Sequence, residues 1–320
     1  MDRPLHVPVL LREVSEVLRP ERGGVYVDAT VGLGGHAEAL LAASEEVRVV
    51  GIDRDPEALA LAAERLARFG GRFTPVEGRH EELAAHLDRL GLTEVAGVVA
   101  DLGVSSMQLD QAERGFSFRR DGPLDMRMGR TGATAADLVA AMEERELARI
   151  FRDYGEERMA GRIARAIVNE RGKAPILTTA RLRDVIAGTV ARRHDDRIDP
   201  ATKVFQALRI ATNRELVDLE RFLDDAIERL SLGARLTVLS YHSLEDRIVK
   251  QTFARHTAGC TCPPSFPTCV CSRRRLIALV TRKPLRASLA ELRDNPRSRS
   301  ARLRAVERLE KEAPATPLER

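Results

Sequence analysis

The sequence contains no tryptophan, and aromatic residues make up only 4% of its 320 residues. Stacking of bases along an extended nucleic-acid strand needs such side chains, so we do not expect it as the main binding mode. No apolar run approaches the roughly 20 residues of a membrane-spanning helix. The first residues also lack the layout of a signal peptide, because Pro8 and Arg12 interrupt a short apolar stretch. We therefore expect a soluble, cytoplasmic protein with no membrane partner.

Cysteine is scarce, and all four cysteines lie in one segment, CTCPPSFPTCVC. In a cytosolic protein such a cluster is more often a metal site than a disulfide pair. Four thiolates suit tetrahedral zinc, although two CxC pairs are tighter than the usual CxxC spacing. Reduced thiols and a disulfide stay open as alternatives. The candidate zinc ligands are Cys260, Cys262, Cys269 and Cys271.

Positive charge is unevenly distributed, although the net charge is only +4. The segment from Arg282 to Arg308 holds nine Lys or Arg against three Asp or Glu, a local excess of +6. Such a segment suits a polyanion such as RNA, with a solvated tail as the alternative. The arginines that we expect to meet phosphates are Arg114, Arg119, Arg120, Arg127 and Arg130, and in the tail Arg297, Arg299, Arg302 and Arg304.

The first hundred residues alternate strand and helix patterns, which predicts a parallel sheet with helices on both faces. The predicted strands are 25–31, 47–53, 73–77 and 95–102, and the predicted helices are 34–43, 56–69 and 81–90. Residues 105–130 are polar and contain glycine, which indicates a long ordered loop. Helix patterns then continue to about residue 230, and strands return at 234–240, 276–281 and 302–306, with a helix at 244–256. A doubly wound sheet with a helical insertion explains this order.

A glycine loop follows the first predicted strand. Residues 32–37, GLGGHA, fit the pattern GxGxxG/A, which serves NAD and S-adenosylmethionine alike. Asp28 distinguishes the two ligands, because a carboxylate beside the loop repels a pyrophosphate and attracts a cation such as a sulfonium. A cap on the following turn is the alternative role of Asp28. Asp53 and Asp101 end the second and fourth strands, and ligands of open α/β sheets lie beyond such strand ends.

Long motifs along the chain resemble the ribosomal RNA small-subunit methyltransferase H family, also called MraW. They are HVPVLLREV, DATVGLGGHAEALL, DRDPEAL, DLGVSSMQLDQAERGFSFRRDGPLDMRM, YGEE, PATKVFQALRIATNREL, YHSLEDRIVK and NPRSRSARLRAVER. The match extends from about His6 to Arg308. It implies methylation of N4 of a cytidine in the decoding region of 16S rRNA, within the small ribosomal subunit. It also implies an α/β fold, a Rossmann-like S-adenosylmethionine-dependent methyltransferase sheet with an inserted all-helical domain.

The resemblance divides the chain into four parts. We expect the methyltransferase domain at 1–130 and 214–310, an inserted helical substrate-recognition domain at 131–213, and a flexible tail at 311–320. For the methyl donor, the resemblance implies Gly34, Gly35, His36, Asp53, His80, Asp101 and Gln108. The charge argument adds Asp28, and the glycine loop adds Gly32. This sequence departs from the family pattern at His80, where an aromatic residue is usual, and at Met107, Asp199 and Tyr241, where Pro, His and Phe are common.

Cytosine N4 is a poor nucleophile, because its lone pair is conjugated with the ring, so an enzyme must position it within hydrogen-bond reach of an acceptor. Candidates for this role are Asp101, Asp125, His242 and Ser243. We rank His242 and Asp125 above Asp101, which already serves the donor. The alternatives are a structural role for His242 and an ion pair of Asp125 with Arg127 or Arg119. Two rival functions stay open: an NAD-dependent oxidoreductase and a non-catalytic RNA-binding factor of ribosome assembly.

Overall fold

The computed structural model describes residues 8–190, 199–258, 262, 266 and 275–309. The chain divides into two compact units, Met1–Gly103 with Asp218–Arg320, and Val104–Val217. The second unit begins well before residue 131, where we expected the helical insertion to begin. The reason is packing, since Phe116, Leu124 and Met126 of the intervening loop are buried in the apolar core of the helices.

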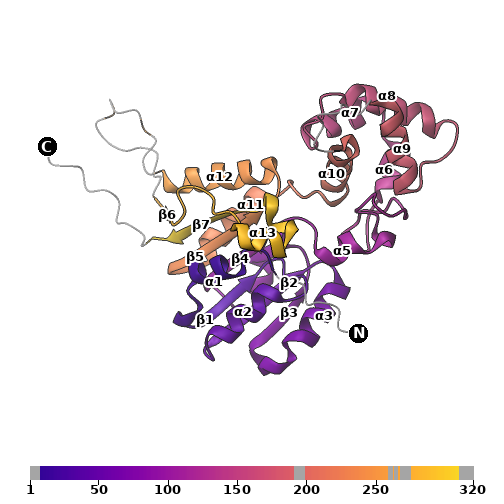
Figure 1. Cartoon of the computed structure of the whole chain (residues 1–320). Helices are drawn as coiled ribbons and strands as arrows, with labels where there is room; N and C mark the ends of the chain where they lie inside the picture. The colour runs from indigo at the N-terminus through magenta and orange to yellow at the C-terminus, as the bar shows by residue number, and fades with distance from the viewer. Residues whose placement is uncertain (1–7, 191–198, 259–261, 263–265, 267–274, 310–320) are drawn as a thin grey trace. The chain divides into compact units, whose positions relative to one another are not determined.

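The first unit is built on a seven-stranded sheet with the order β3-β2-β1-β4-β5-β7-β6 (Figure 1). The first five strands are parallel, and β7 pairs antiparallel with both β5 and β6. The predicted Rossmann-like α/β sheet is therefore confirmed, while the antiparallel direction of β7 was not predicted. The strands are β1 (Gly24–Asp28), β2 (Val47–Asp53), β3 (Phe73–Glu77), β4 (Val95–Asp101), β5 (Leu230–Ser240), β6 (Ile277–Leu279) and β7 (Arg302–Arg308).

Both faces of this sheet are covered. Neighbouring residues of a strand point to opposite faces, so two buried neighbours show that each face is packed. Tyr26 of β1 belongs to an apolar cluster that includes residues of α1, α2 and α3. Its neighbour Val27 lies outside that cluster and is equally buried. Among the remaining helices, α11 contacts both α4 and α12. These helices are α1 (Leu11–Leu18), α2 (Gly35–Ala43), α3 (Pro56–Leu66), α4 (Leu83–Arg89), α11 (Leu219–Arg229) and α12 (Ser243–Thr257).

Short helices complete the first unit. The α-helix α13 (Leu289–Asp294) precedes β7, and the turns of 3-10 helix are η1 (Pro20–Arg22), η2 (Ala67–Arg72), η3 (His80–Glu82) and η5 (Pro296–Ser300). Where α3 begins, Asp55 accepts a hydrogen bond from the Glu57 backbone, and Pro56 occupies the first turn, where proline is favoured.

The second unit is helical. Its elements are α5 (Ser106–Asp110), η4 (Ala112–Arg114), α6 (Ala135–Ala141), α7 (Glu144–Asp153), α8 (Ala160–Arg171), α9 (Thr179–Thr189) and α10 (Pro200–Asn213). Thr178 caps α9 and Asp199 caps α10 through side-chain oxygens, which are favoured at this position. Each helix turns its apolar side chains into one shared core, which explains why the unit is compact. Among the described residues of the whole chain, no helix is long and apolar enough to span a membrane.

Candidate functional site

Asp28 ends β1 and is almost completely buried, with 1% of its surface exposed. Its Oδ1 accepts a hydrogen bond from the Thr30 backbone at 3.3 Å, while Oδ2 has no hydrogen-bond partner among the described residues. Burial raises the pKa of Asp28 to about 6, against the attraction of nearby His36. A buried carboxylate oxygen without a partner is costly, so its retention points to a group that binds there.

His36 lies in the first turn of α2, close to the carboxylates of Asp28 and Asp101. It is 5% exposed, and within the described structure neither ring nitrogen makes a hydrogen bond. Nε2 lies 3.7 Å from Oδ2 of Asp101, a distance for charge attraction and not for a hydrogen bond. Burial lowers the pKa of His36, but the carboxylates of Asp101 and Asp28 outweigh burial and raise it above its ordinary value.

Asp101 ends β4, two residues beyond Val99, which pairs with Asp28 of the neighbouring strand β1. Its backbone N–H donates to Thr30 Oγ1 at 2.6 Å, and its Oδ1 accepts from the Tyr241 hydroxyl at 2.7 Å. Burial, reinforced by the charge of Asp101, raises the pKa of Tyr241 well above its usual range, so the phenol keeps its proton and donates. The chain order reverses between β1 and β4, and ligands of doubly wound sheets bind at this switch point.

Backbone conformation and close packing explain the glycines of the loop. Gly34 precedes α2 with φ 79°, in the left-handed region that favours glycine. At Gly35 a Cβ atom would lie only 2.2 Å from Cγ of Pro8, so a larger residue would displace the N-terminal segment. Gly32 has φ 50° and donates its N–H to Oδ2 of Asp53 at 2.8 Å. The loop is thus anchored to the end of β2.

Asp53 holds two backbone groups at once. Besides Gly32, the Asp55 N–H donates to Oδ1 of Asp53 at 2.9 Å. Burial raises the pKa of Asp53, although both hydrogen bonds oppose the increase. Each carboxylate oxygen has a second lone pair, so the side chain can still accept from a hydroxyl group of a ligand.

His80, predicted to stack on a donor base, lies in η3 after β3. Its ring meets Phe222 of α11 edge to face, with 4.9 Å between ring centroids. Burial lowers the pKa of His80, so the ring is neutral at physiological pH, and its buried Nε2 lacks a hydrogen-bond partner in the described part of the chain. One ring edge is therefore used for packing.

Gln108 belongs to the second unit, where it closes a capping box at the start of α5. Its Oε1 accepts from the Ser105 backbone at 3.0 Å, and its own N–H donates to Ser105 Oγ at 3.2 Å. The spacing Ser-x-x-Gln is the sequence signature of such a box, so this capping role could have been predicted from the sequence. Binding of a ligand by Gln108 stays a prediction.

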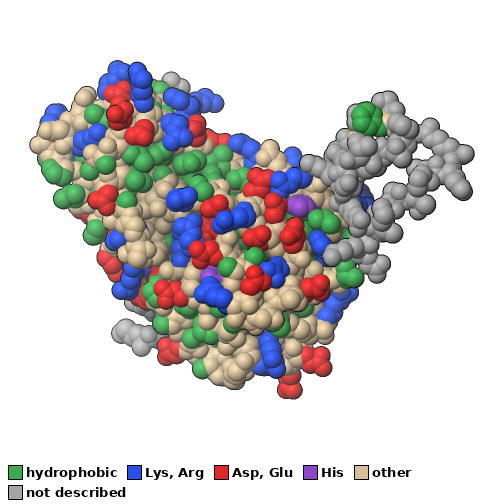
Figure 2. Space-filling view, turned by 180° about the vertical axis from the view of Figure 1, so that it is seen from behind, with side chains coloured by type: hydrophobic (Ala, Val, Ile, Leu, Met, Phe, Trp, Pro, Cys, Tyr) green, Lys and Arg blue, Asp and Glu red, His purple; other side chains and the backbone are tan. Residues whose placement is uncertain are grey.

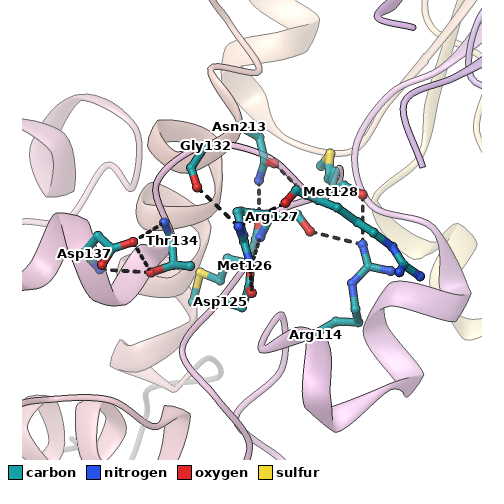
Figure 3. A network of polar contacts seen from close by, with 10 residues as sticks. Arg114, Asp125, Met126, Arg127, Met128, Gly132, Thr134, Asp137 and Asn213 are labelled. Atoms are coloured by element: carbon teal, nitrogen blue, oxygen red, sulfur yellow. Dashed lines mark hydrogen bonds and ion pairs between the residues drawn. The ribbon is translucent and has the colours of Figure 1, made fainter. Parts of the chain in front are cut away.

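Asp125 also lies in the second unit, in a network around residues 114–137 (Figure 3). Its two oxygens accept from Nε and Nη2 of Arg127 at 2.8 and 2.7 Å. Despite partial burial, these bonds hold the pKa of Asp125 below its usual value. Arg114 donates to the carbonyl groups of Arg127 and Met128, which fixes the same loop. The ion pair that the sequence left open as an alternative is the one observed.

His242 precedes α12 and caps it. Its Nδ1 accepts from the Glu245 N–H at 3.4 Å, and Glu245 accepts from the backbone of both Tyr241 and His242. Nε2 lies 3.1 Å from Oε1 of Glu245 without hydrogen-bond geometry, and it is a buried atom with no hydrogen-bond partner among the residues described. Since Nδ1 accepts, the neutral ring carries its proton on Nε2. Ser243 is the first residue of α12.

Two expectations concern the last part of the chain. Of the four cysteines, only Cys262 is described, and Cys260, Cys269 and Cys271 lie outside the described residues, so the zinc site stays a prediction. The basic tail is partly a strand, because Arg302 and Arg304 belong to β7 and pair with Asp246 of α12 at 3.0 and 2.6 Å. Sequence reasoning expected both arginines to meet phosphates, and the structure uses them to join β7 to α12.

Comparison with known proteins matches residues 3–309 to the model of the MraW methylase family. The chain belongs to the MraW methylase family. A protein of Pelobacter propionicus named Ribosomal RNA small subunit methyltransferase H is 54% identical over 309 residues, which cover 95% of this chain and 98% of the relative. A protein of the same name from Symbiobacterium thermophilum is 54% identical over 310 residues, covering 95% and 97%. In this family member Asp28, Asp53 and Asp101 end β1, β2 and β4.

Proposed function

We propose that this protein uses S-adenosylmethionine to methylate N4 of a cytidine in the decoding region of small-subunit (16S) rRNA. One observation carries the donor assignment: at the switch point of the sheet, the buried Oδ2 of Asp28 has no hydrogen-bond partner among the described residues. A phosphate would be repelled there, whereas the ammonium or sulfonium of S-adenosylmethionine would be attracted. Membership of the MraW methylase family and the names of the relatives support the rRNA substrate.

The donor would lie along the carboxyl ends of β1, β2 and β4. Asp53 would accept from the ribose while it holds the glycine loop through Gly32. Asp28 and His36 would face the charged amino-acid part of the donor, and His80 would offer the exposed part of its ring to the adenine. Bound S-adenosylmethionine supplies a methyl group that is activated by its positive sulfur.

The acceptor nitrogen must lose one proton for each methyl group that it gains. We assign the hydrogen bond from N4 to Asp101, because Tyr241 fixes its Oδ1 and leaves Oδ2 toward His36. Asp125 is paired with Arg127 and would first have to break that ion pair. We therefore rank Asp101 above Asp125 for this role, the reverse of the order that we expected from the sequence. His242, with its proton on Nε2, would donate to an acceptor atom of the base and so orient it. Positioning of this kind supplies most of the rate in a direct displacement.

The second unit would hold the RNA, and we keep the substrate-recognition role for the helical residues 131–213. A transfer assay tests the function: the protein is incubated with methyl-tritiated S-adenosylmethionine and either 30S or 70S particles. Label in 16S rRNA, recovered as N4-methylcytidine after digestion to nucleosides, is the expected result. Binding to 30S without label would indicate an assembly factor, and calorimetry that detects NAD but not S-adenosylmethionine would indicate an oxidoreductase.

A further inference from the structure

The helices α7 and α8 of the second unit carry two rows of exposed arginines that the site described above does not use. On α7 the row has spacings of four and three residues, and the same spacings recur from two residues before α8 into that helix. All six side chains are exposed. We call them the hairpin arginines: Arg145, Arg149 and Arg152, and Arg158, Arg162 and Arg165.

The spacing places the α7 row on one side of its helix, and likewise Arg162 and Arg165 on one side of α8, because residues three and four apart are neighbours on a helix surface. The opposite side of α7 is apolar and buried, through Leu147, Ile150 and Phe151. In α8, Ile163 and Ile167 are buried in the same core. The arginine rows therefore face away from the core of the second unit.

The two rows lie next to each other. Only residues 154–159 connect α7 to α8, so the helices form an antiparallel hairpin. Nε of Arg165 lies 3.3 Å from Oε1 of Glu144, which places the second turn of α8 beside the start of α7. From this contact both rows extend toward the connecting turn, and the α7 row spans about 10 Å at 1.5 Å of rise per residue.

The hairpin arginines differ from most other cations of the unit in having few acidic partners. Arg165 pairs with Glu144, whereas Arg145, Arg149, Arg152, Arg158 and Arg162 make no ion pair or hydrogen bond through their side chains to any described residue. The nearby acids are mostly engaged elsewhere. Glu143 and Glu146 form the capping box of α7, and Glu157 pairs with Lys203.

A cluster of Lys and Arg side chains is visible on the surface of the helical unit. In Figure 2 these side chains gather, with some acidic groups beside them, along the upper margin of that unit, which is the margin where α7 and α8 lie in Figure 1. The segment as a whole is not basic, so the clustering comes from the placement of charges on one face.

We propose that the hairpin arginines are a docking surface for backbone phosphates of the small-subunit rRNA. This inference rests on the proposed function and specifies where the second unit meets its RNA. Guanidinium groups bind phosphates through paired hydrogen bonds, and two adjacent rows present several of them to consecutive phosphates. Such contacts position the RNA and make binding depend on salt, without reading its sequence.

The test compares two triple variants that each remove three positive charges from the second unit. The first, R145Q/R149Q/R152Q, clears the α7 row. The matched control, K173Q/R181Q/R183Q, removes exposed cations that are already paired with Glu170 or Asp184. For both variants we measure KM for 30S particles, kcat, the Kd of S-adenosylmethionine, and the dependence of KM on salt.

We expect the α7 variant to raise KM for 30S at least tenfold and to reduce the slope of log KM against log salt by about 0.7 to 0.9 for each phosphate that the variant no longer binds. Its kcat at saturation and its Kd for the donor should equal those of the wild type, and the control should change KM less than twofold. Equal effects of the two variants on KM and slope would overturn the docking surface. A wild type that methylates no rRNA would instead refute the proposed function.

Discussion

The acidic groups of the two units differ in how completely they are satisfied. At the strand ends of the first unit, one oxygen of Asp28 has no hydrogen-bond partner in the described structure. Both ring nitrogens of the neighbouring His36 also lack one among these residues. In the second unit Asp125 is partly exposed, yet both of its oxygens are bound to Arg127. Sequence reasoning placed Asp28 at the methyl donor and Asp125 at the acceptor nitrogen. The comparison shows that partners, and not residue type, separate a group prepared for a ligand from one that stabilises a loop.

Asp53 should give the largest loss of donor binding, because Asp53→Ala removes the anchor of Gly32 and Asp55 together with the ribose acceptor. We expect the Kd of S-adenosylmethionine to rise about 100-fold, since hydrogen bonds to charged groups contribute about 1.5–3 kcal/mol each. Isothermal titration calorimetry measures this. Glu77→Ala, at the exposed end of β3, serves as the control and should change Kd less than twofold. A similar loss in both variants would contradict the role of Asp53.

His242 tests whether a cap can also act on substrate. His242→Ala should lower kcat about tenfold or more and also destabilise α12, because loss of an N-cap costs about 1 kcal/mol. His242→Asn keeps a capping oxygen but has no imidazole, so it should restore stability in urea denaturation without restoring kcat. If the asparagine variant turns over at the wild-type rate, His242 is only a cap.

Asp28 should limit the stability of the fold above pH 6. Its folded pKa is raised to about 6 from 3.8, so its stabilising contribution is present below pH 4 and is lost as pH rises through 6. Ionisation of the buried group then costs on the order of 2–3 kcal/mol. Asp28→Asn should therefore unfold at higher urea concentration than the wild type at pH 7, while the two converge near pH 4. The same variant should bind S-adenosylmethionine about tenfold more weakly.

A lower or equal stability of Asp28→Asn at pH 7 would show that a protein group already satisfies the carboxylate. The groups that face Asp28 are His36, Asp101 and Asp53, and their charges are included in its raised pKa. His36 has a pKa raised above its ordinary value of 6.5, so its stabilising contribution is lost only at higher pH than that of Asp28. The difference in unfolding free energy between the wild type and Asp28→Asn isolates the contribution of Asp28.

Tyr241→Phe should have a smaller effect, because it removes one hydroxyl group that orients Asp101. We expect kcat to fall about three- to tenfold through the loss of one hydrogen bond to a charged group, with little change in the Kd of the donor. Single-turnover methylation of 30S particles separates the two quantities. An increase in donor Kd at constant kcat would place Asp101 on the donor and not on the acceptor.

Asp125→Asn should have the smallest effect. The partly exposed ion pair with Arg127 contributes less than about 1 kcal/mol, and we expect both donor Kd and kcat to stay within twofold of the wild type. A large decrease in kcat would return Asp125 to the role that sequence reasoning gave it.

Local signals predicted much of the fold. The strand patterns predicted β2 and β3 with their observed bounds. Contacts between distant residues could not be predicted in this way. The hydrogen bond from Tyr241 to Asp101 joins residues 140 positions apart, and the pair of Arg304 with Asp246 depends on the antiparallel direction of β7. The site was predicted as a set of strand-end acids, but their partners required the structure.

Proton release on donor binding tests the central claim most directly. Wild type and Asp28→Asn are titrated with S-adenosylmethionine near pH 6 in buffers of different ionisation enthalpy. If a cation binds at Asp28, the carboxyl group that is partly protonated in the free protein must ionise. We predict that the wild type releases a substantial fraction of one proton and that Asp28→Asn does not release it. Equal proton release by the two proteins would contradict the account.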